Sequence, residues 1–206
     1  MIFQKKKIHQ YSIKKDIQKD KFENNVFGFW LYLMSECIIF SILFVVFFIM
    51  NKNRQLNQLF DQKIVSLWTI FLETFFLLST SFLNSFLVYI LDKISFKYVL
   101  YLIFSILFCG MTFLYIEISE LYKIFCFFCL NKINGFFSSF FALLGMHCLH
   151  VFFALLWTFV LLLHIFKNTI IKNVYKNFVC LNLFWHFLDI IWLFIITYIY
   201  LLNNII

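Results

Sequence analysis

The chain has 206 residues, of which 64% are hydrophobic, and a formal net charge of +7. A soluble domain of this size could not bury so much apolar surface, so the composition indicates an integral membrane protein. The positive charge does not indicate nucleic-acid binding, because that requires a soluble frame presenting Lys and Arg on one face. We therefore expect no nucleic-acid partner.

The N-terminal part of the chain is polar. Residues 1–26 are rich in Lys, with Asp16, Asp20 and Glu23 interspersed. A secretory signal is not expected, since the following apolar run is too long and no small-residue cleavage site precedes it. The sequence predicts a polar cytoplasmic tail over residues 1–26, followed by one transmembrane domain over residues 27–206.

Five apolar segments follow the tail. Each is close to the length of about 20 residues that spans a bilayer, and only helices satisfy every backbone group within such spans. We therefore predict an all-α bundle of five transmembrane helices, with short loops that make neighbouring helices antiparallel. The helices are expected over residues 27–50, 64–91, 98–117, 136–166 and 177–202.

The distribution of basic residues predicts the orientation in the membrane. The tail and the loops after the second and fourth helices carry twelve of the seventeen Lys and Arg residues, and the opposite side carries five. Because Lys and Arg concentrate on the cytoplasmic side, the N-terminus is predicted to be cytoplasmic and the C-terminus to lie outside.

Ionisable residues within the predicted helices are informative, since each costs about 2.5–3.5 kcal/mol at the centre of a membrane helix. On the fifth helix, Asn182, His186 and Asp189 share one face, and His186 and Asp189 are spaced for a direct hydrogen bond. On the second helix, Glu73 and Asn84 share a face with Thr80 in the same way. We interpret these stripes as polar contacts between helices, with a proton-conducting role as the alternative.

The fourth predicted helix carries small residues and two histidines. Ser138, Ala142, Gly145 and Ala154 predict close contact with a neighbouring helix. His147 and His150 share a face, but His186 lies at a different depth on its helix, so a haem held between two histidines is not expected. Cys126 and Cys129 form a single CxxC pair, which is a weak zinc signal and leaves a labile disulfide open.

Three stretches together resemble subunit III of the cytochrome o ubiquinol oxidases, a branch of the haem-copper oxidase subunit III family. They are residues 27–40, with Trp30 and Glu36; residues 136–151, with the pattern Gly-x-His-x-x-His-Val; and residues 183–192, with Trp-His-Phe-x-Asp-x-x-Trp. Residues 72–80 and 115–120 also resemble this branch. The five predicted helices favour it, because cytochrome c oxidase subunit III has two further N-terminal helices.

The resemblance implies that the chain is a non-catalytic subunit of a complex that oxidises ubiquinol, reduces oxygen to water and moves protons. The haems, copper and quinol site are expected in the large subunit I, with subunits I, II and IV and membrane lipids as partners. The expected location is the bacterial inner (plasma) membrane, and the expected role is in assembly, lipid binding and stability. No catalytic, cofactor or metal residue is expected. The polar residues of the family motifs are Glu36, Glu73, Glu117, Glu120, His147, His150, His186 and Asp189.

Two alternatives remain open. One is a shortened cytochrome c oxidase subunit III, and the other is a small ion or proton transporter lined by Glu36, Glu73 and the pair of His186 and Asp189. Transporters often contain broken helices, which the absence of Pro and the presence of only four Gly encode poorly. Within the resemblance, Glu36 corresponds to a membrane acid linked to proton uptake, a role we retain as a hypothesis.

Overall fold

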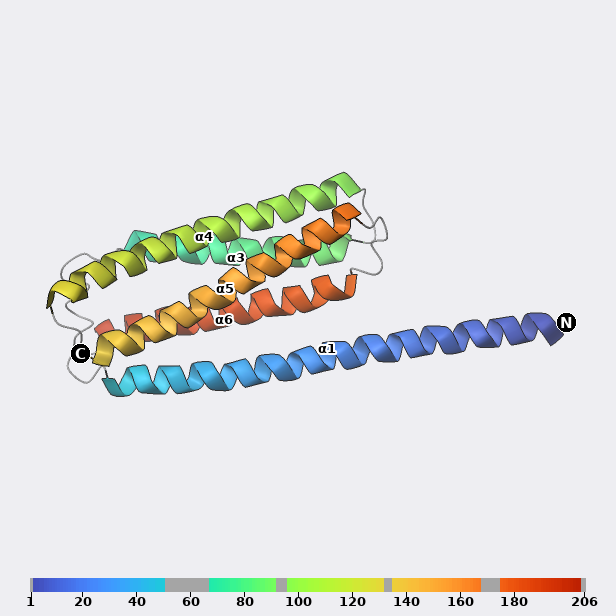
Figure 1. The fold of residues 1–206 in the computed structure, drawn as a ribbon, viewed down its shortest axis with the longest axis horizontal. Helices are drawn as coiled ribbons and strands as arrows, with labels where there is room; N and C mark the ends of the chain where they lie inside the picture. The colour runs from blue at the N-terminus through green and yellow to red at the C-terminus, as the bar shows by residue number, and fades with distance from the viewer. Residues whose placement is uncertain (1, 51–66, 92–95, 132–134, 168–174, 205–206) are drawn as a thin grey trace. The chain divides into compact units, whose positions relative to one another are not determined.

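The computed structural model describes residues 2–50, 67–91, 96–131, 135–167 and 175–204. Within these ranges the chain forms helices and no strand (Figure 1). The helices are α1 (Ile2–Met50), α3 (Leu67–Ile90), α4 (Phe96–Asn131), α5 (Gly135–Lys167) and α6 (Tyr175–Asn204). Five stretches are long and apolar enough to cross a membrane, namely Glu23–Met50, Trp68–Ile90, Lys97–Cys126, Gly135–Lys167 and Tyr175–Tyr198. The predicted all-α membrane fold is confirmed.

Two helices extend well beyond their predicted bounds. Helix α4 continues to Asn131, whereas the sequence predicted its end at residue 117. Helix α1 begins at Ile2, within the predicted polar tail. Polar residues such as Glu, Lys and Gln are good helix formers. Because neither Pro nor Gly interrupts residues 2–27 or 111–131, both helices continue beyond the bounds that hydropathy predicted.

Four helices pack as a ring. Helix α3 contacts α4, α4 contacts α5, α5 contacts α6, and α6 contacts α3 (Figure 1). The core between them is built from large apolar side chains, of which Trp185, Phe113 and Phe178 are fully buried. This arrangement brings the polar stripes of α3 and α6 into contact.

The chain divides into two compact units, residues 1–38 and residues 39–206. Residues 39–50, the last part of α1, belong to the larger unit, together with α3 to α6. There the Phe47 ring lies 5.5 Å from the ring of Phe136 and 5.6 Å from the ring of Tyr198, measured between centroids. Residues 39–50 are thus fixed to α5 and α6 by aromatic contacts.

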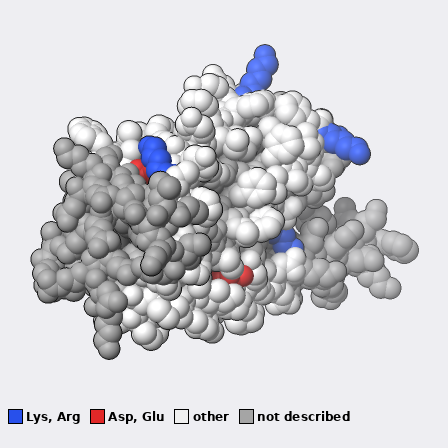
Figure 2. All heavy atoms as spheres, turned by 60° about the vertical axis from the view of Figure 1, so that its left-hand side comes forward, with Lys and Arg blue, Asp and Glu red and all other residues white. Residues whose placement is uncertain are grey.

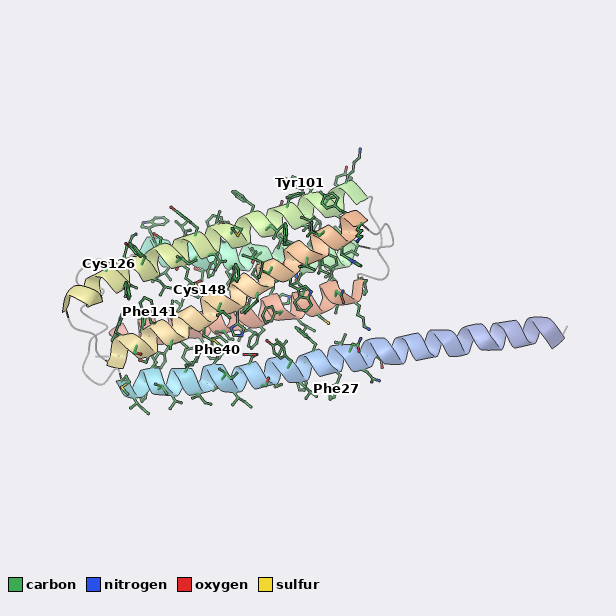
Figure 3. The ribbon with its side chains drawn as sticks, in the orientation of Figure 1. Phe27, Phe40, Tyr101, Cys126, Phe141 and Cys148 are labelled. Carbon is green, nitrogen blue, oxygen red and sulfur yellow. The ribbon has the colours of Figure 1, made fainter. Side chains whose placement is uncertain are left out.

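The outer faces of the helices are apolar. On α4, Tyr101, Phe108 and Tyr115 are exposed, and Tyr101 projects outward (Figure 3). Charged side chains are sparse among the described residues on the face drawn in Figure 2. Such a surface suits contact with lipid tails or with other membrane helices.

The close helix contact predicted for α5 is found at a different glycine. Ser138 and Ala142 are exposed, and a Cβ atom added to Gly145 meets nothing within 4 Å, so that part of the prediction is wrong. Of the four small residues only Ala154 is buried. The close approach occurs at Gly110 of α4, where an added Cβ lies 2.5 Å from Leu155 Cδ2 and 3.4 Å from Trp185 Cη2.

Candidate functional site

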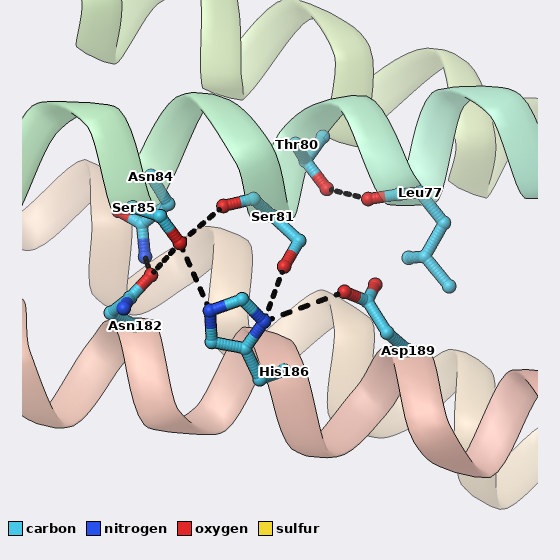
Figure 4. A network of polar contacts seen from close by, with 8 residues as sticks. All are labelled: Leu77, Thr80, Ser81, Asn84, Ser85, Asn182, His186 and Asp189. Atoms are coloured by element: carbon cyan, nitrogen blue, oxygen red, sulfur yellow. Dashed lines mark hydrogen bonds and ion pairs between the residues drawn. The ribbon is translucent and has the colours of Figure 1, made fainter.

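The polar stripes of α3 and α6 meet around His186 (Figure 4). Ser81 Oγ lies 2.9 Å from His186 Nδ1, and Ser85 Oγ lies 2.9 Å from His186 Nε2. Asn182 Oδ1 accepts a hydrogen bond from Ser85 Oγ at 3.0 Å and a longer one from Asn84 Nδ2 at 3.4 Å. Both nitrogens of the imidazole are therefore held by hydroxyl groups of the neighbouring helix.

The predicted direct hydrogen bond between His186 and Asp189 is not formed. Nδ1 of His186 lies 3.9 Å from Oδ2 of Asp189, which is within reach of an ion pair but too long for a hydrogen bond. The hydroxyl of Ser81 faces both side chains and links them. The reason is the competition from α3, because the hydroxyls of Ser81 and Ser85 occupy both nitrogens of His186.

A second polar cluster lies between α3 and α4. Glu73 of α3 and Glu117 of α4 are 2% and 1% exposed, and both interact electrostatically with the partly buried Glu120. The hydroxyl of Thr69 bonds to Glu120, and Lys123 lies one helical turn further along α4. The sequence analysis did not relate Glu73 on the second helix to Glu117 and Glu120 on the third, but the three carboxyl groups form one cluster.

Helix α5 contributes Cys148 to this cluster. The residue lies near the middle of α5 (Figure 3), and its thiol faces the carboxyl group of Glu117. Among the described residues, neither oxygen of Glu117 has another hydrogen-bond partner, and Oε1 of Glu73 has none. A thiol is a weak donor, so these buried oxygens are poorly satisfied.

His147 is enclosed by aromatic rings. It is fully buried, its ring stacks on Trp192 at a centroid distance of 5.2 Å, and Phe113 meets it edge-on at 6.0 Å. Neither ring nitrogen of His147 has a hydrogen-bond partner in the described part of the chain. The geometry is that of a packing residue in the core between α4, α5 and α6.

His150 and Glu36 have different surroundings. His150 Nδ1 lies 2.7 Å from the carbonyl oxygen of Met146, and its ring contacts Phe40 at a centroid distance of 5.3 Å. Glu36 lies on α1 in the smaller unit, where its carboxyl group contacts the hydroxyl of Tyr32 one turn earlier.

No three His, Cys, Asp or Glu side chains come together so as to hold a metal ion in the described ranges. Cys126 is exposed, while the side chain of Cys129 lies outside the described residues. The labile disulfide between them therefore stays a prediction. The chemistry that the two clusters can support is hydrogen bonding and proton exchange.

Sequence reasoning missed Ser81, Ser85 and Cys148 as members of these clusters. Ser81 and Ser85 are four residues apart on α3, on the face that meets α6. That spacing is a detectable signal. Cys148 follows His147 directly, and nothing in its spacing distinguishes it from the other apolar cysteines.

Comparison with known proteins identifies the family. The cytochrome bo(3) ubiquinol oxidase subunit 3 of Buchnera aphidicola subsp. Schizaphis graminum is 39% identical over 86% of this chain and 94% of its own length. The protein of the same name from Pseudomonas putida is 34% identical over 89% of this chain and 88% of its own. The chain belongs to the cytochrome bo(3) ubiquinol oxidase subunit 3 family. No model of a protein family matches it.

The subunit 3 family extends to oxidases named for another electron donor. The cytochrome c oxidase subunit 3 of Alkalihalophilus pseudofirmus is 30% identical over 88% of this chain and 88% of its own length. The residues that the sequence predicted as family motifs include Gly145, His147 and His150 on α5, and His186 and Asp189 on α6. With its five apolar helices, the chain is thus a multi-pass membrane protein of this family.

Proposed function

We propose that the chain is the non-catalytic third subunit of a bacterial ubiquinol oxidase, a complex that oxidises ubiquinol, reduces oxygen to water and translocates protons. The observation that supports this most strongly is the similarity to ubiquinol oxidase third subunits over almost the whole of both chains. In this proposal the haems, the copper and the quinol site belong to subunit I, and subunits II and IV complete the complex.

The proposed contribution of this chain is structural. The polar contacts between α3 and α6 and the aromatic packing around His147 help to hold four helices together in one compact unit. The exposed apolar faces of these helices suit lipids and the membrane helices of subunit I. The motif residues His147, His150, His186 and Asp189 then act by holding the subunit together for assembly.

The test is affinity purification of the tagged chain from its native membrane in mild detergent, with an untagged strain as control. We expect co-purification of a large haem-bearing subunit, ubiquinol oxidase activity, and a reduced-minus-oxidised spectrum that the isolated chain lacks. Recovery of the chain alone and colourless would contradict the proposal and favour the transporter. Recovery alone and coloured would show that this chain itself binds haem.

A shortened cytochrome c oxidase subunit III is the second candidate, because a relative with that name covers most of the chain. The same purified complex distinguishes the two. Oxygen consumption driven by ubiquinol but not by reduced cytochrome c supports the first proposal. A partner subunit II with a binuclear copper-thiolate domain supports the second.

We also propose that the N-terminus is cytoplasmic and that the protein resides in the bacterial inner membrane. The support is the excess of Lys and Arg in the N-terminal tail and in the loops after the second and fourth helices. Reporter fusions test it: a fluorescent protein that folds only in the cytoplasm should be bright at the N-terminus and dark at the C-terminus. The opposite pattern would overturn the orientation without affecting the family assignment.

Finally, we propose a role for Glu36 in proton uptake, which its motif resemblance suggests. Its carboxyl group contacts the hydroxyl of Tyr32 on the same helix. The variant Glu36→Gln should assemble normally yet slow oxygen consumption, whereas the neighbouring Ser35→Ala should not. An assembled Glu36→Gln complex with unchanged turnover would exclude this role.

A further inference from the structure

The surroundings of the carboxyl cluster of α3 and α4 disfavour the state in which all three carboxyl groups are ionised. Glu73, Glu117 and Glu120 interact with one another, and Glu73 and Glu117 are almost completely buried. Like charges in contact destabilise each other. An ionised side chain inside a membrane helix costs about 2.5–3.5 kcal/mol even on the lenient insertion scale.

Counter-charge within reach of the cluster is limited. From α4, Lys123 interacts with Glu120, which is the least buried of the three acids. From α3, Thr69 offers a hydroxyl to Glu120, and from α5, Cys148 offers a thiol to Glu117. One cation and two neutral groups, among the described side chains, cannot balance three ionised carboxylates.

The carboxyl group of Glu117 is, in addition, poorly hydrogen-bonded. Both of its oxygens are enclosed, and in the described structure they meet no donor stronger than the Cys148 thiol. Oε1 of Glu73 is likewise enclosed and unpartnered. Buried polar atoms almost always have a partner. A proton on one carboxyl group supplies a donor that its neighbour, or an internal water molecule between them, accepts.

We propose that Glu73, Glu117 and Glu120 form a proton-binding site inside the helix ring, and that the side chain of Cys148 borders this site. The site holds at least one proton at neutral pH, shared between Glu117 and Glu73. Glu120, which is partly exposed, connects it to the surface and allows the proton to exchange. The proposal concerns protonation of this chain and does not rest on the function of the complex that contains it.

The experiment is infrared spectroscopy of the purified complex, or of the chain in nanodiscs if it purifies alone, with Glu labelled by ¹³C at its side-chain carboxyl group. A protonated carboxyl group absorbs at a C=O stretching frequency distinct from that of the ionised form, and the band shifts in D₂O. We expect a band of this kind at neutral pH, sensitive to both labels. Glu117→Gln should remove one carboxyl equivalent from it, or shift it if the proton passes to Glu73.

The matched control is Glu23→Gln, since Glu23 is exposed and lies on α1 outside the cluster. It should leave the band unchanged. If Glu117→Gln fails to assemble, Glu73→Gln tests the same shared proton. The proposal is overturned if the labelled wild-type protein shows no protonated Glu band at neutral pH, or if the band is unaffected by both substitutions.

Discussion

Ser81 Oγ and His186 Nδ1 lie 2.9 Å apart across the contact between α3 and α6, although 105 residues separate them in the chain. Ser85 binds the other ring nitrogen at the same distance. The imidazole is half-exposed, with 51% of its side chain accessible, yet its two polar atoms are directed into the helix contact. The ring thus joins two helices while presenting its carbon edge outward.

The first prediction concerns these two hydroxyls. The double variant Ser81→Ala/Ser85→Ala removes both partners of His186 and should lower the stability of the subunit. Hydrogen bonds between membrane helices contribute about 0.6 kcal/mol each on average, so a loss of roughly 1 kcal/mol is expected. Reversible unfolding of the detergent-solubilised protein measures it.

The matched control is Ser105→Ala. Ser105 Oγ donates to the carbonyl oxygen of Tyr101 within α4, and its hydroxyl bonds to no second helix in the described ranges. It should change the free energy of unfolding very little. Equal losses for the control and the double variant would show that the bonds to His186 contribute nothing specific.

Much of this contact was predictable from the sequence. Asn182, His186 and Asp189 fall on one face of a helix, and so do Thr80 and Asn84, which predicted polar contacts between helices without naming the partner of each face. The helix period determines which residues share a face, but not which atoms pair across the contact. That is why the direct bond between His186 and Asp189 was expected and Ser81 was missed.

The carboxyl cluster and the close contact at Gly110 were not predictable in the same way. Glu117 is the last residue of the predicted third helix and Glu120 lies beyond its predicted end, so the sequence did not relate either of them to Glu73. A single Gly forms no periodic pattern in the sequence. Whether another helix approaches it depends on side-chain packing, which one sequence does not reveal. Gly145, in a run of small residues, had the stronger pattern and yet meets nothing within 4 Å.

The second prediction contrasts these two glycines. In Gly110→Ala the new Cβ would lie 2.5 Å from Leu155 Cδ2, so Leu155 or its helix must move. Overpacking of this kind typically costs about 1–3 kcal/mol. Gly145→Ala has free space and should be neutral or stabilising by up to about 1 kcal/mol, since Ala favours a helix. Thermal inactivation should occur at a lower temperature than in the wild type for Gly110→Ala, and at the same or a higher temperature for Gly145→Ala. Equal behaviour would contradict the packing at Gly110.

The third prediction concerns Asp189, which is 7% exposed and faces both Ser81 and His186. Asp189→Leu removes its side of the polar contact and should reduce the amount of assembled complex. Asp189→Asn keeps a hydrogen-bonding group of the same size and should assemble better than the Leu variant. Blue native electrophoresis measures assembly. An Asp189→Leu complex that assembled fully but lost proton pumping would show that this residue acts on protons rather than on structure.

The fourth prediction tests whether His147 is a packing residue. Its ring is stacked on Trp192 and both of its nitrogens are buried without a hydrogen-bond partner in the described chain, so its polarity costs free energy that an apolar ring would not. His147→Phe should therefore retain or improve stability, and turnover and the optical spectrum of the complex should not change. His147→Ala should instead leave a cavity and destabilise the subunit by about 2–5 kcal/mol, as large-to-small core substitutions do. If His147→Phe were stable and assembled but lost activity or altered the spectrum, His147 would carry a chemical role that its aromatic surroundings do not suggest.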